Sequence, residues 1–337
     1  MESMKTLDEK YIRIMQGYCF SGIRQENGLV IYEMKNSTGY GEMVCYDVFP
    51  GVMIAHNKMA METCYQDVGP VDGFLQINYC YSGCYEFELD NGSRCFVGEG
   101  DLVVNDPEKL VVSASRLPRG TYEGISVMVE LEPAERWLKE NVSWGKFDLN
   151  ELKQMIGQNH VPILARADAR VGRIFQELFE IDNQIKEPYF ILKVTELFLF
   201  LSLAAKESMV ELPHFSPEVV ESTMQAYHFL TEKPLRTVTL PELAAEFHVS
   251  ETSLRCCFKS IYGQTVGAFQ RKQRINIGAQ LLKDTEALSV GEIALRVGYE
   301  NPSKFSKAFK DMMGETPLLY RHRMQSADGR NEFSNTL

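Results

Sequence analysis

The sequence lacks the long apolar segments that membrane and secreted proteins carry. No run of about 18 apolar residues is free of charge, and the longest candidate, 189–205, contains Lys193 and Glu196. The first residues include no apolar segment typical of a signal peptide. The eight cysteines form no C-x-x-C pair. These absences predict a cytoplasmic protein with no membrane partner and with reduced thiols.

Acidic residues are missing from one stretch, although the chain as a whole is acidic. The net charge is −11, which is unfavourable for a protein that binds DNA. The segment 216–324 nevertheless holds 14 Lys and Arg against 12 Asp and Glu, and Thr252–Lys283 contains no acidic residue at all. A basic strip behind an acidic front half is the charge pattern of a nucleic-acid-binding domain.

The front of the chain has the pattern of short β-strands. Apolar and polar residues alternate through Leu75–Leu89, which predicts a strand with one buried face. Ser82 and Gly83 predict a bulge in that strand, and Asp90-Asn91-Gly92 predicts a hairpin turn. Similar strand patterns lie at 29–34, 43–49, 94–97, 102–104 and 125–131. We therefore expect a β-barrel or sandwich over residues 1–160.

Helical spacing replaces this pattern in residues 161–211. Apolar residues recur at intervals of three and four, first around Phe175 and then around Phe198. Such an apolar helical region predicts burial, in part against a second copy of the chain in a homodimer. Leu212–Pro217 contains two prolines and is the expected linker. The segment 218–324 is expected to be all-helical, and 325–337 to be a polar tail.

Two helix-turn-helix patterns repeat within the helical part. In the first, Thr239 and Glu242 form a capping box before a short apolar helix, and Ser250 starts a second helix that ends at Gly263. In the second, the capping box is formed by Ser289 and Glu292. The second helix of this motif starts at Asn301 and ends at Gly314. Phe258-Lys259 and Phe309-Lys310 stand at matching places in the two units. A long helix, 266–282, separates them, as expected for two readers set about one turn of DNA apart.

These residues closely resemble the AraC/XylS family of bacterial regulators. The resemblance covers 235–323 and is carried most specifically by Ile293-Ala294, Val297-Gly298-Tyr299, Phe309-Lys310, Pro317 and Tyr320-Arg321. It implies an α+β protein: a cupin-like N-terminal β-barrel with a helical dimerisation region, followed by an all-α domain with two helix-turn-helix motifs joined by a long helix. The implied function is transcription regulation by binding double-stranded promoter or operator DNA. RNA polymerase would be a further partner if the protein is an activator.

The second helix of each motif is expected to enter a major groove. The side chains expected to face bases are Thr252, Arg255, Cys256, Pro302, Ser303, Ser306 and Lys307. Those expected to contact phosphates are Ser250, Lys259, Asn301, Lys304 and Lys310. Family members usually carry arginine where this chain has Cys256 and Lys307. Since bidentate recognition of guanine depends on arginine, the base preference at these two positions is open.

The front domain resembles the cupin-like sensor barrels of many family members. Enzymatic cupins hold metals with several histidines, whereas only His56 lies among the predicted strands. We therefore expect no enzyme activity and no cofactor, and instead a small-molecule effector of unknown identity. Two alternatives keep the same DNA-binding domain. One is a thiol or metal sensor that uses Cys80, Cys84 and Cys95, and the other is control by a partner protein.

Overall fold

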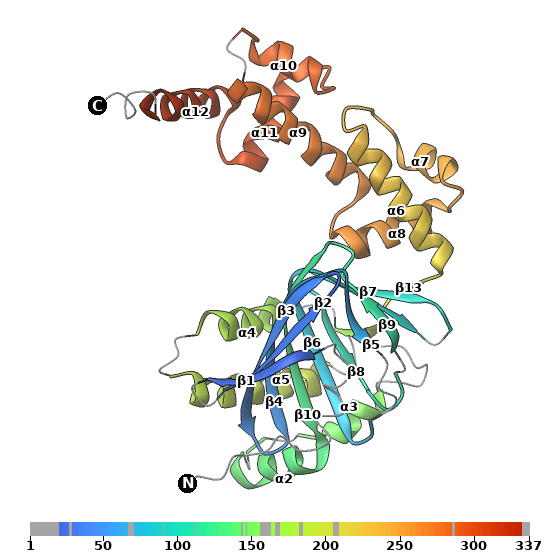
Figure 1. The fold of residues 1–337 in the computed structure, drawn as a ribbon, viewed down its shortest axis with the longest axis vertical. Coiled ribbons are helices and arrows are strands. Elements are labelled where there is room, and N and C mark those ends of the chain that lie inside the picture. Colours follow the sequence, from blue (N-terminus) through green and yellow to red (C-terminus); the bar gives the residue numbers. More distant parts are fainter. Residues whose placement is uncertain are drawn as a thin grey trace. The chain divides into compact units, whose positions relative to one another are not determined.

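The computed structural model describes residues 20–26, 29–66, 71–89, 91–110, 112–142, 144–145, 147–155, 163–165, 169–181, 185–204, 209–284 and 287–331 (Figure 1). The chain divides into two compact units. One comprises Met1–Pro217 with Ser260–Gly263, and the other Glu218–Lys259 with Gln264–Leu337. Residues 260–262 are the end of helix α8 (Glu251–Tyr262), whose other residues belong to the second unit.

The first unit is built on one curled antiparallel sheet. Nine strands follow one another in the order β1-β2-β3-β4-β10-β6-β8-β11-β12, and β7, β9, β5 and β13 extend it from the far half of β6. The strands are β1 (Phe20–Glu26), β2 (Leu29–Asn36), β3 (Gly39–Phe49), β4 (Val52–Ala60), β5 (Thr63–Gln66), β6 (Phe74–Leu89), β7 (Arg94–Gly98), β8 (Leu102–Asn105), β9 (Val112–Arg116), β10 (Thr121–Glu130), β11 (Ile163–Ala165), β12 (Met209–Glu211) and β13 (His214–Phe215).

Strand β6 bends the sheet because its two halves pair with different partners. Its first half lies between β10 and β8, and its second half between β7 and β9. The register shifts where Gly124 pairs with Cys80 and Glu123 with Ser82, so Tyr81 is an extra residue. Gly83, with φ of 87°, follows this bulge. The bulge predicted at Ser82 and Gly83 is thus present, and it redirects the strand as bulges generally do.

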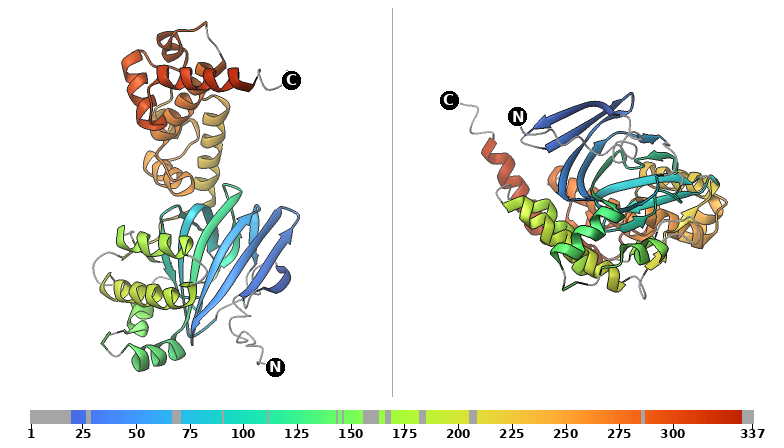
Figure 2. Two further views of the ribbon diagram at one scale, coloured as in Figure 1. Left: turned by 90° about the vertical axis from the view of Figure 1, so that its left-hand side faces the viewer. Right: turned by 90° about the horizontal axis from the view of Figure 1, so that it is seen from below.

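Four helices cover one face of the sheet (Figure 2). They are α2 (Leu131–Asn141), α3 (Leu149–Met155), α4 (Ala169–Glu180) and α5 (Lys186–Ala204). Phe175 and Leu178 of α4 and Val194, Leu197 and Phe198 of α5 are fully buried against apolar side chains of the strands. This layer explains why the spacing of these helices is so strongly apolar.

The inner face of the curl is packed with sulfur-containing side chains. Six buried methionines and four buried cysteines share this core with aromatic and aliphatic residues. They are Met34, Met43, Met53, Met59, Met61, Met128, Cys45, Cys64, Cys80 and Cys95. Methionine adapts to irregular gaps, which suits the interior of a half-closed sheet.

The first unit departs from the predicted layout in three places. The sheet is a curled half-barrel, and strands β11 and β12 lie at the two ends of the region expected to be helical; they pair with each other, and β11 also pairs with β8. Residues 212–217 are not a free linker: β13 pairs with β7, and Leu212 and Phe215 are buried. Helices α2 and α3, within the region expected to form the barrel, were not predicted.

The second unit is all-helical. Its helices are α6 (Pro217–Glu232), α7 (Leu240–Glu246), α8 (Glu251–Tyr262), α9 (Val266–Asp284), α10 (Val290–Arg296), α11 (Pro302–Met313) and α12 (Pro317–Asn331). Pro317 is the first residue of α12, and α12 continues into the segment expected to be a polar tail. Within the described residues, no helix has both the length and the apolar character of a membrane span.

Candidate nucleic-acid interface

The first helix-turn-helix motif starts at a complete capping box. The Glu242 amide donates to Thr239 Oγ1 at 3.4 Å, and the Thr239 amide donates to a Glu242 carboxylate oxygen at 2.8 Å. These bonds satisfy amides that the first turn of α7 leaves free. They also hold the pKa of the Glu242 carboxyl below its usual value. The predicted cap is therefore confirmed, and it fixes where α7 begins.

The second motif starts in the same way. The Ser289 amide donates to Glu292 at 2.7 Å and the Glu292 amide donates to Ser289 Oγ at 3.2 Å. At the far end of the motif, Gly314 closes α11 with φ of 81° and donates its amide to Lys310 O at 2.9 Å. Left-handed glycine at this position is a common helix end. Both ends of the second motif are therefore defined by local hydrogen bonds.

The two motifs share their backbone hydrogen bonds as well as their sequence pattern. The Val249 amide donates to Ala244 O at 3.0 Å, and at the matching place the Tyr299 amide donates to Ala294 O at 2.9 Å. A second matching pair of bonds joins the Phe247 amide to Leu243 O at 3.1 Å and the Val297 amide to Ile293 O at 3.0 Å. The predicted internal repeat is thus a repeat of turn geometry, which gives α8 and α11 the same setting on α7 and α10.

Each recognition helix is held by a small aromatic core. In the first motif, Phe258 of α8 lies 5.7 Å from Phe269 of α9 and 6.3 Å from Tyr227 of α6, measured between ring centroids. In the second, Phe305 and Phe309 of α11 are fully buried. Gly278 of α9 faces Phe305 so closely that an added Cβ would lie 2.9 Å from the ring. Because one face of α8 and one face of α11 are buried, the opposite faces of these helices are exposed to solvent.

The predicted contact residues lie mostly on those free faces. Thr252, Arg255, Cys256 and Lys259 are exposed on α8. Pro302, Ser303, Lys304, Lys307 and Lys310 are exposed on α11, and Ser306 is half-buried there. An exposed row on a helix that starts after the turn is the arrangement that places side chains in a groove.

Ser250 and Asn301 have a structural role that the sequence also indicated. Ser250 Oγ accepts from the Ser253 amide at 3.0 Å, and Asn301 Oδ1 accepts from the Ser303 amide at 2.8 Å. Both side chains cap the recognition helices. Because lysine brings a charged donor, the exposed Lys259, Lys304 and Lys310 are better candidates for phosphate contacts than these two capping side chains.

Helix α9 contributes residues that the predicted set omits. Arg274 Nη2 donates to Thr237 Oγ1 at 2.7 Å, just before the cap of α7. Gln270 donates to Val238 O at 2.8 Å and accepts from the Val238 amide at 3.3 Å. On the other side, the Arg274 guanidinium lies against Gly298, where an added Cβ would be 3.6 Å from it. Arg274 thus touches both motifs.

A cavity of about 250 Å³ lies beside this arginine. Its lining combines two guanidinium groups with hydroxyl and amide groups: Thr237, Val238, Gly267, Gln270, Arg271, Arg274 and Tyr299. Burial raises the pKa of Tyr299, although the positive charges of Arg271 and Arg274 oppose the rise. The sequence shows that Arg271 and Arg274 share one face of a helix. It does not show that this face lies between the two motifs.

The cysteines of the first unit do not form the proposed thiol cluster. Burial raises the pKa of the Cys45 and Cys95 thiols to about 12 and raises that of Cys80 further. The bulge at Tyr81 lies between Cys80 and Cys84, and Cys80 Sγ turns to the carbonyl of Ser82. Within the part of the chain that the structure describes, no three His, Cys, Asp or Glu side chains are grouped as metal ligands would be.

His56 is also a packing residue. Its ring lies 5.4 Å from the Tyr46 ring and 5.3 Å from the Phe179 ring, between β4 and the helices. Burial, together with the positive charge of Lys186, lowers the pKa of His56 to about 4. A neutral imidazole among aromatic rings fits the structural role expected for a lone histidine.

Comparison with known proteins agrees with the motif geometry. The family model described as a helix-turn-helix domain matches residues 243–323. The HTH-type transcriptional activator RhaR of Enterobacter sp. (strain 638) is 37% identical over 92 residues, which cover 27% of this chain and 32% of that protein. The HTH-type transcriptional regulator AlkR of Acinetobacter baylyi is 34% identical over 107 residues, which cover 32% of this chain and 33% of that protein.

Among solved structures, the C-terminal domain of AraT, a response regulator from Geobacillus stearothermophilus, is 33% identical. The match covers 32% of this chain and 86% of the AraT domain, with a TM-score of 0.28. The chain matches only about a third of the length of the curated relatives RhaR and AlkR. Residues 243–323 therefore form an AraC-type helix-turn-helix domain, the type that the sequence motifs indicated for this part of the chain.

Proposed function

We propose that the chain is a sequence-specific DNA-binding transcription regulator that places α8 and α11 in two major grooves. The observation that carries this proposal is the repeated turn geometry, with the same amide-to-carbonyl bonds at Val249 and Tyr299. Each turn is followed by a helix with an exposed polar or basic row. Two matched helix-turn-helix motifs joined by the rigid helix α9 suit a DNA site with two half-sites.

Charge supports the same proposal. Lys259 on α8 and Lys304 and Lys310 on α11 are exposed, and α9 adds the exposed Arg271 and Lys272. Contacts from such residues to phosphates release counterions, so DNA affinity would fall steeply with salt. Sequence choice would come from Arg255 and from the polar row of α11, because an arginine side chain reads guanine in the major groove.

The first unit supports the finer proposals of effector control and dimerisation. Helix α5 is mostly apolar, and Leu192 on it is 66% exposed. A single exposed leucine is ordinary on a protein surface, so dimerisation is proposed because twofold dimers are the commonest soluble oligomers. A small-molecule effector bound to this unit would then act on the arrangement of two DNA-binding domains. RNA polymerase is a further partner in the case of an activator.

Selection of DNA sites from a random duplex pool, followed by fluorescence anisotropy with the full chain, tests the proposed function. We expect an enriched sequence with two half-sites and an affinity that falls linearly with salt on logarithmic axes. A pool that shows no enrichment, or an enriched duplex bound no better than its scrambled version, would overturn the proposal. The alternative of control by a partner protein predicts specific DNA binding that small molecules leave unchanged.

A further inference from the structure

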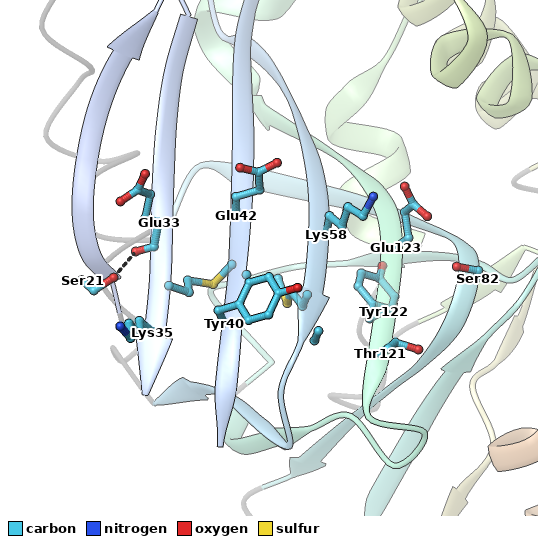
Figure 3. Close-up of a pocket in the computed structure, with 14 residues that line it drawn as sticks. Ser21, Glu33, Lys35, Tyr40, Glu42, Lys58, Ser82, Thr121, Tyr122 and Glu123 are labelled. Carbon is cyan, nitrogen blue, oxygen red and sulfur yellow. Dashed lines mark hydrogen bonds between the residues drawn. The ribbon is translucent and has the colours of Figure 1, made fainter. Parts of the chain in front are cut away.

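A groove of about 580 Å³ crosses the sheet of the first unit, and Met34, Met59 and Tyr122 of the methionine-rich core form part of its lining (Figure 3). It is lined from six strands, β1, β2, β3, β4, β10 and β6. Small-molecule sites commonly have volumes of this order. The groove is therefore large enough for a metabolite.

One row of charged side chains runs along this groove. Glu33, Glu42, Lys58 and Glu123 stand on neighbouring strands and are paired in register: Glu33 with Glu42, Glu42 with Lys58, and Lys58 with Glu123. Figure 3 shows the four side chains side by side. Cross-strand neighbours have Cβ atoms about 5 Å apart. We call these four residues the charged row.

The two ends of the charged row differ in how their charges are compensated. At one end, Arg24 of β1 holds Glu33 at 2.9 Å and Glu42 at 3.4 Å. At the other end, Lys58 and Glu123 form no ion pair and no side-chain hydrogen bond with any residue that the structure describes, although they are direct cross-strand partners. An ammonium and a carboxylate thus stand next to each other, and no side chain in the described part of the chain bonds to either of them.

Hydroxyl groups surround this free end. Ser82 is the cross-strand partner of Glu123, and Thr121 and Tyr40 also line the groove. Tyr40 is 70% exposed. The lining holds three carboxylates, of Glu33, Glu42 and Glu123, and two ammonium groups, of Lys35 and Lys58. A groove that holds separate charges of both signs is complementary to a ligand of the same kind.

We propose that this groove binds a small zwitterion of the amino-acid type, with its carboxylate on Lys58 and its ammonium on Glu123. Charge-assisted hydrogen bonds at both ends would orient the ligand, and the nearby hydroxyls would bind its polar side chain. The charged groups of the groove lie on the face of the sheet opposite to the side chains of Met34 and Met59. As an effector site it deepens the proposed function, but the binding step itself does not depend on DNA.

The free end of the charged row adjoins a segment that reaches the helices. Ser82 follows Tyr81, the bulge residue, and the Tyr81 ring lies 4.5 Å from Phe179 of α4. Lys58 lies two residues from His56 on β4 and so shares its face, and His56 packs on Phe179 too. A ligand that draws Lys58 and Glu123 together therefore acts on strands that support α4.

Binding is tested on the full chain by thermal shift and calorimetry. The probes are the common L-amino acids at millimolar concentration, their matched amines without the carboxylate, their N-acetyl forms without the ammonium, and glycerol as a neutral polyol. We expect at least one amino acid to bind, while its matched amine and N-acetyl form bind about 10-fold or more weakly. If no amino acid binds, or if the amine or the polyol binds equally well, the proposal is overturned.

Two variants locate the site. Lys58→Met and Glu123→Gln should each weaken binding of the responding amino acid about 10-fold or more, whereas Lys139→Met on α2 should leave it unchanged. Unaltered melting temperatures would show that the variants fold. An affinity that stays the same in both groove variants would place the ligand elsewhere and overturn the proposal. DNA affinity without ligand is measured in parallel, so a chain that binds the amino acid but not DNA overturns the proposed function alone.

Discussion

His248 and Gly298 occupy the same position in the two helix-turn-helix turns, and both have left-handed backbone conformations, with φ of 52° and 83°. Each follows the C-cap residue of the short first helix, Phe247 or Val297, and precedes the residue whose amide bonds back to Ala244 or Ala294. Glycine adopts this conformation without a Cβ clash, and histidine does not. The first turn therefore carries a local strain that the second avoids.

Replacing His248 with glycine should stabilise the second unit. The relief of strain is offset in part by the greater freedom of glycine in the unfolded chain, so the expected gain is about 0.5 to 1 kcal/mol. The converse change, Gly298→Ala, should cost about 1 kcal/mol, since the added Cβ meets only ordinary contacts with Arg274 but keeps the unfavourable φ. Urea unfolding of the full chain measures both, and a loss of stability in His248→Gly would contradict the argument.

Arg274 is expected to set the relation between the two motifs. It bonds Thr237 before α7 and lies against Gly298 in the second turn. Arg274→Met should therefore weaken binding to a selected two-half-site duplex by about 10-fold, the value of one charged hydrogen bond. The variant should also tolerate duplexes whose half-site spacing differs by one base pair, because the second motif is then held less firmly relative to the first.

Two further variants separate this geometric role from simple charge. Thr237→Val removes the same hydrogen bond but keeps the arginine, and should reproduce the relaxed spacing. Lys272→Ala removes an exposed charge of α9 and should lower affinity equally at every spacing. Anisotropy titrations at fixed salt give all three profiles. A uniform loss at every spacing in Arg274→Met would identify it as a phosphate contact.

Much of the second unit could be predicted because its signals are local. The caps at Thr239 and Ser289 and the helix end at Gly314 depend on residues within three or four positions. The contacts of Arg274 are different, since Thr237 lies 37 residues away in the chain. A periodic pattern shows that an arginine is on a helix, but not which distant hydroxyl it meets.

The first unit was harder to predict because its strands pair over long distances. The alternation in Leu75–Leu89 and the bulge at Ser82-Gly83 were visible, but not that the two halves of β6 pair with different strands. Strand β13 has only two residues, so no period could reveal that it pairs with β7. The charged row depends on the register of four strands, which the sequence does not specify.

The pH dependence of stability should report the burial of His56. Its pKa in the folded chain is lowered to about 4 by burial and by Lys186, against a usual value of 6.5. The unfolded chain therefore binds the extra proton first as pH falls, so the contribution is present above about 6.5 and is lost as pH falls towards 4. The loss amounts to about 3 kcal/mol at most.

The groups around His56 are Lys186 from α5 and Tyr46 from β3, and Lys186 donates to the Tyr46 hydroxyl at 2.9 Å. His56→Leu should flatten the fall in stability between pH 6.5 and pH 4, measured by urea unfolding. An acid slope that stays the same in this variant would mean that other groups cause it.

Arg255 and Lys259 should separate base recognition from phosphate binding within one helix. Both are exposed on α8 and lie four residues apart, so they share one face. Arg255→Ala should cost about 1 to 3 kcal/mol on the selected duplex and relax the base choice at one position. Lys259→Ala should weaken all duplexes alike and reduce the slope of log affinity against log salt by about 1. Repeating the site selection and the salt titration with each variant measures both effects. If Arg255→Ala weakened every duplex equally, Arg255 would be a phosphate contact, and the first groove would be read mainly by Thr252 and Cys256.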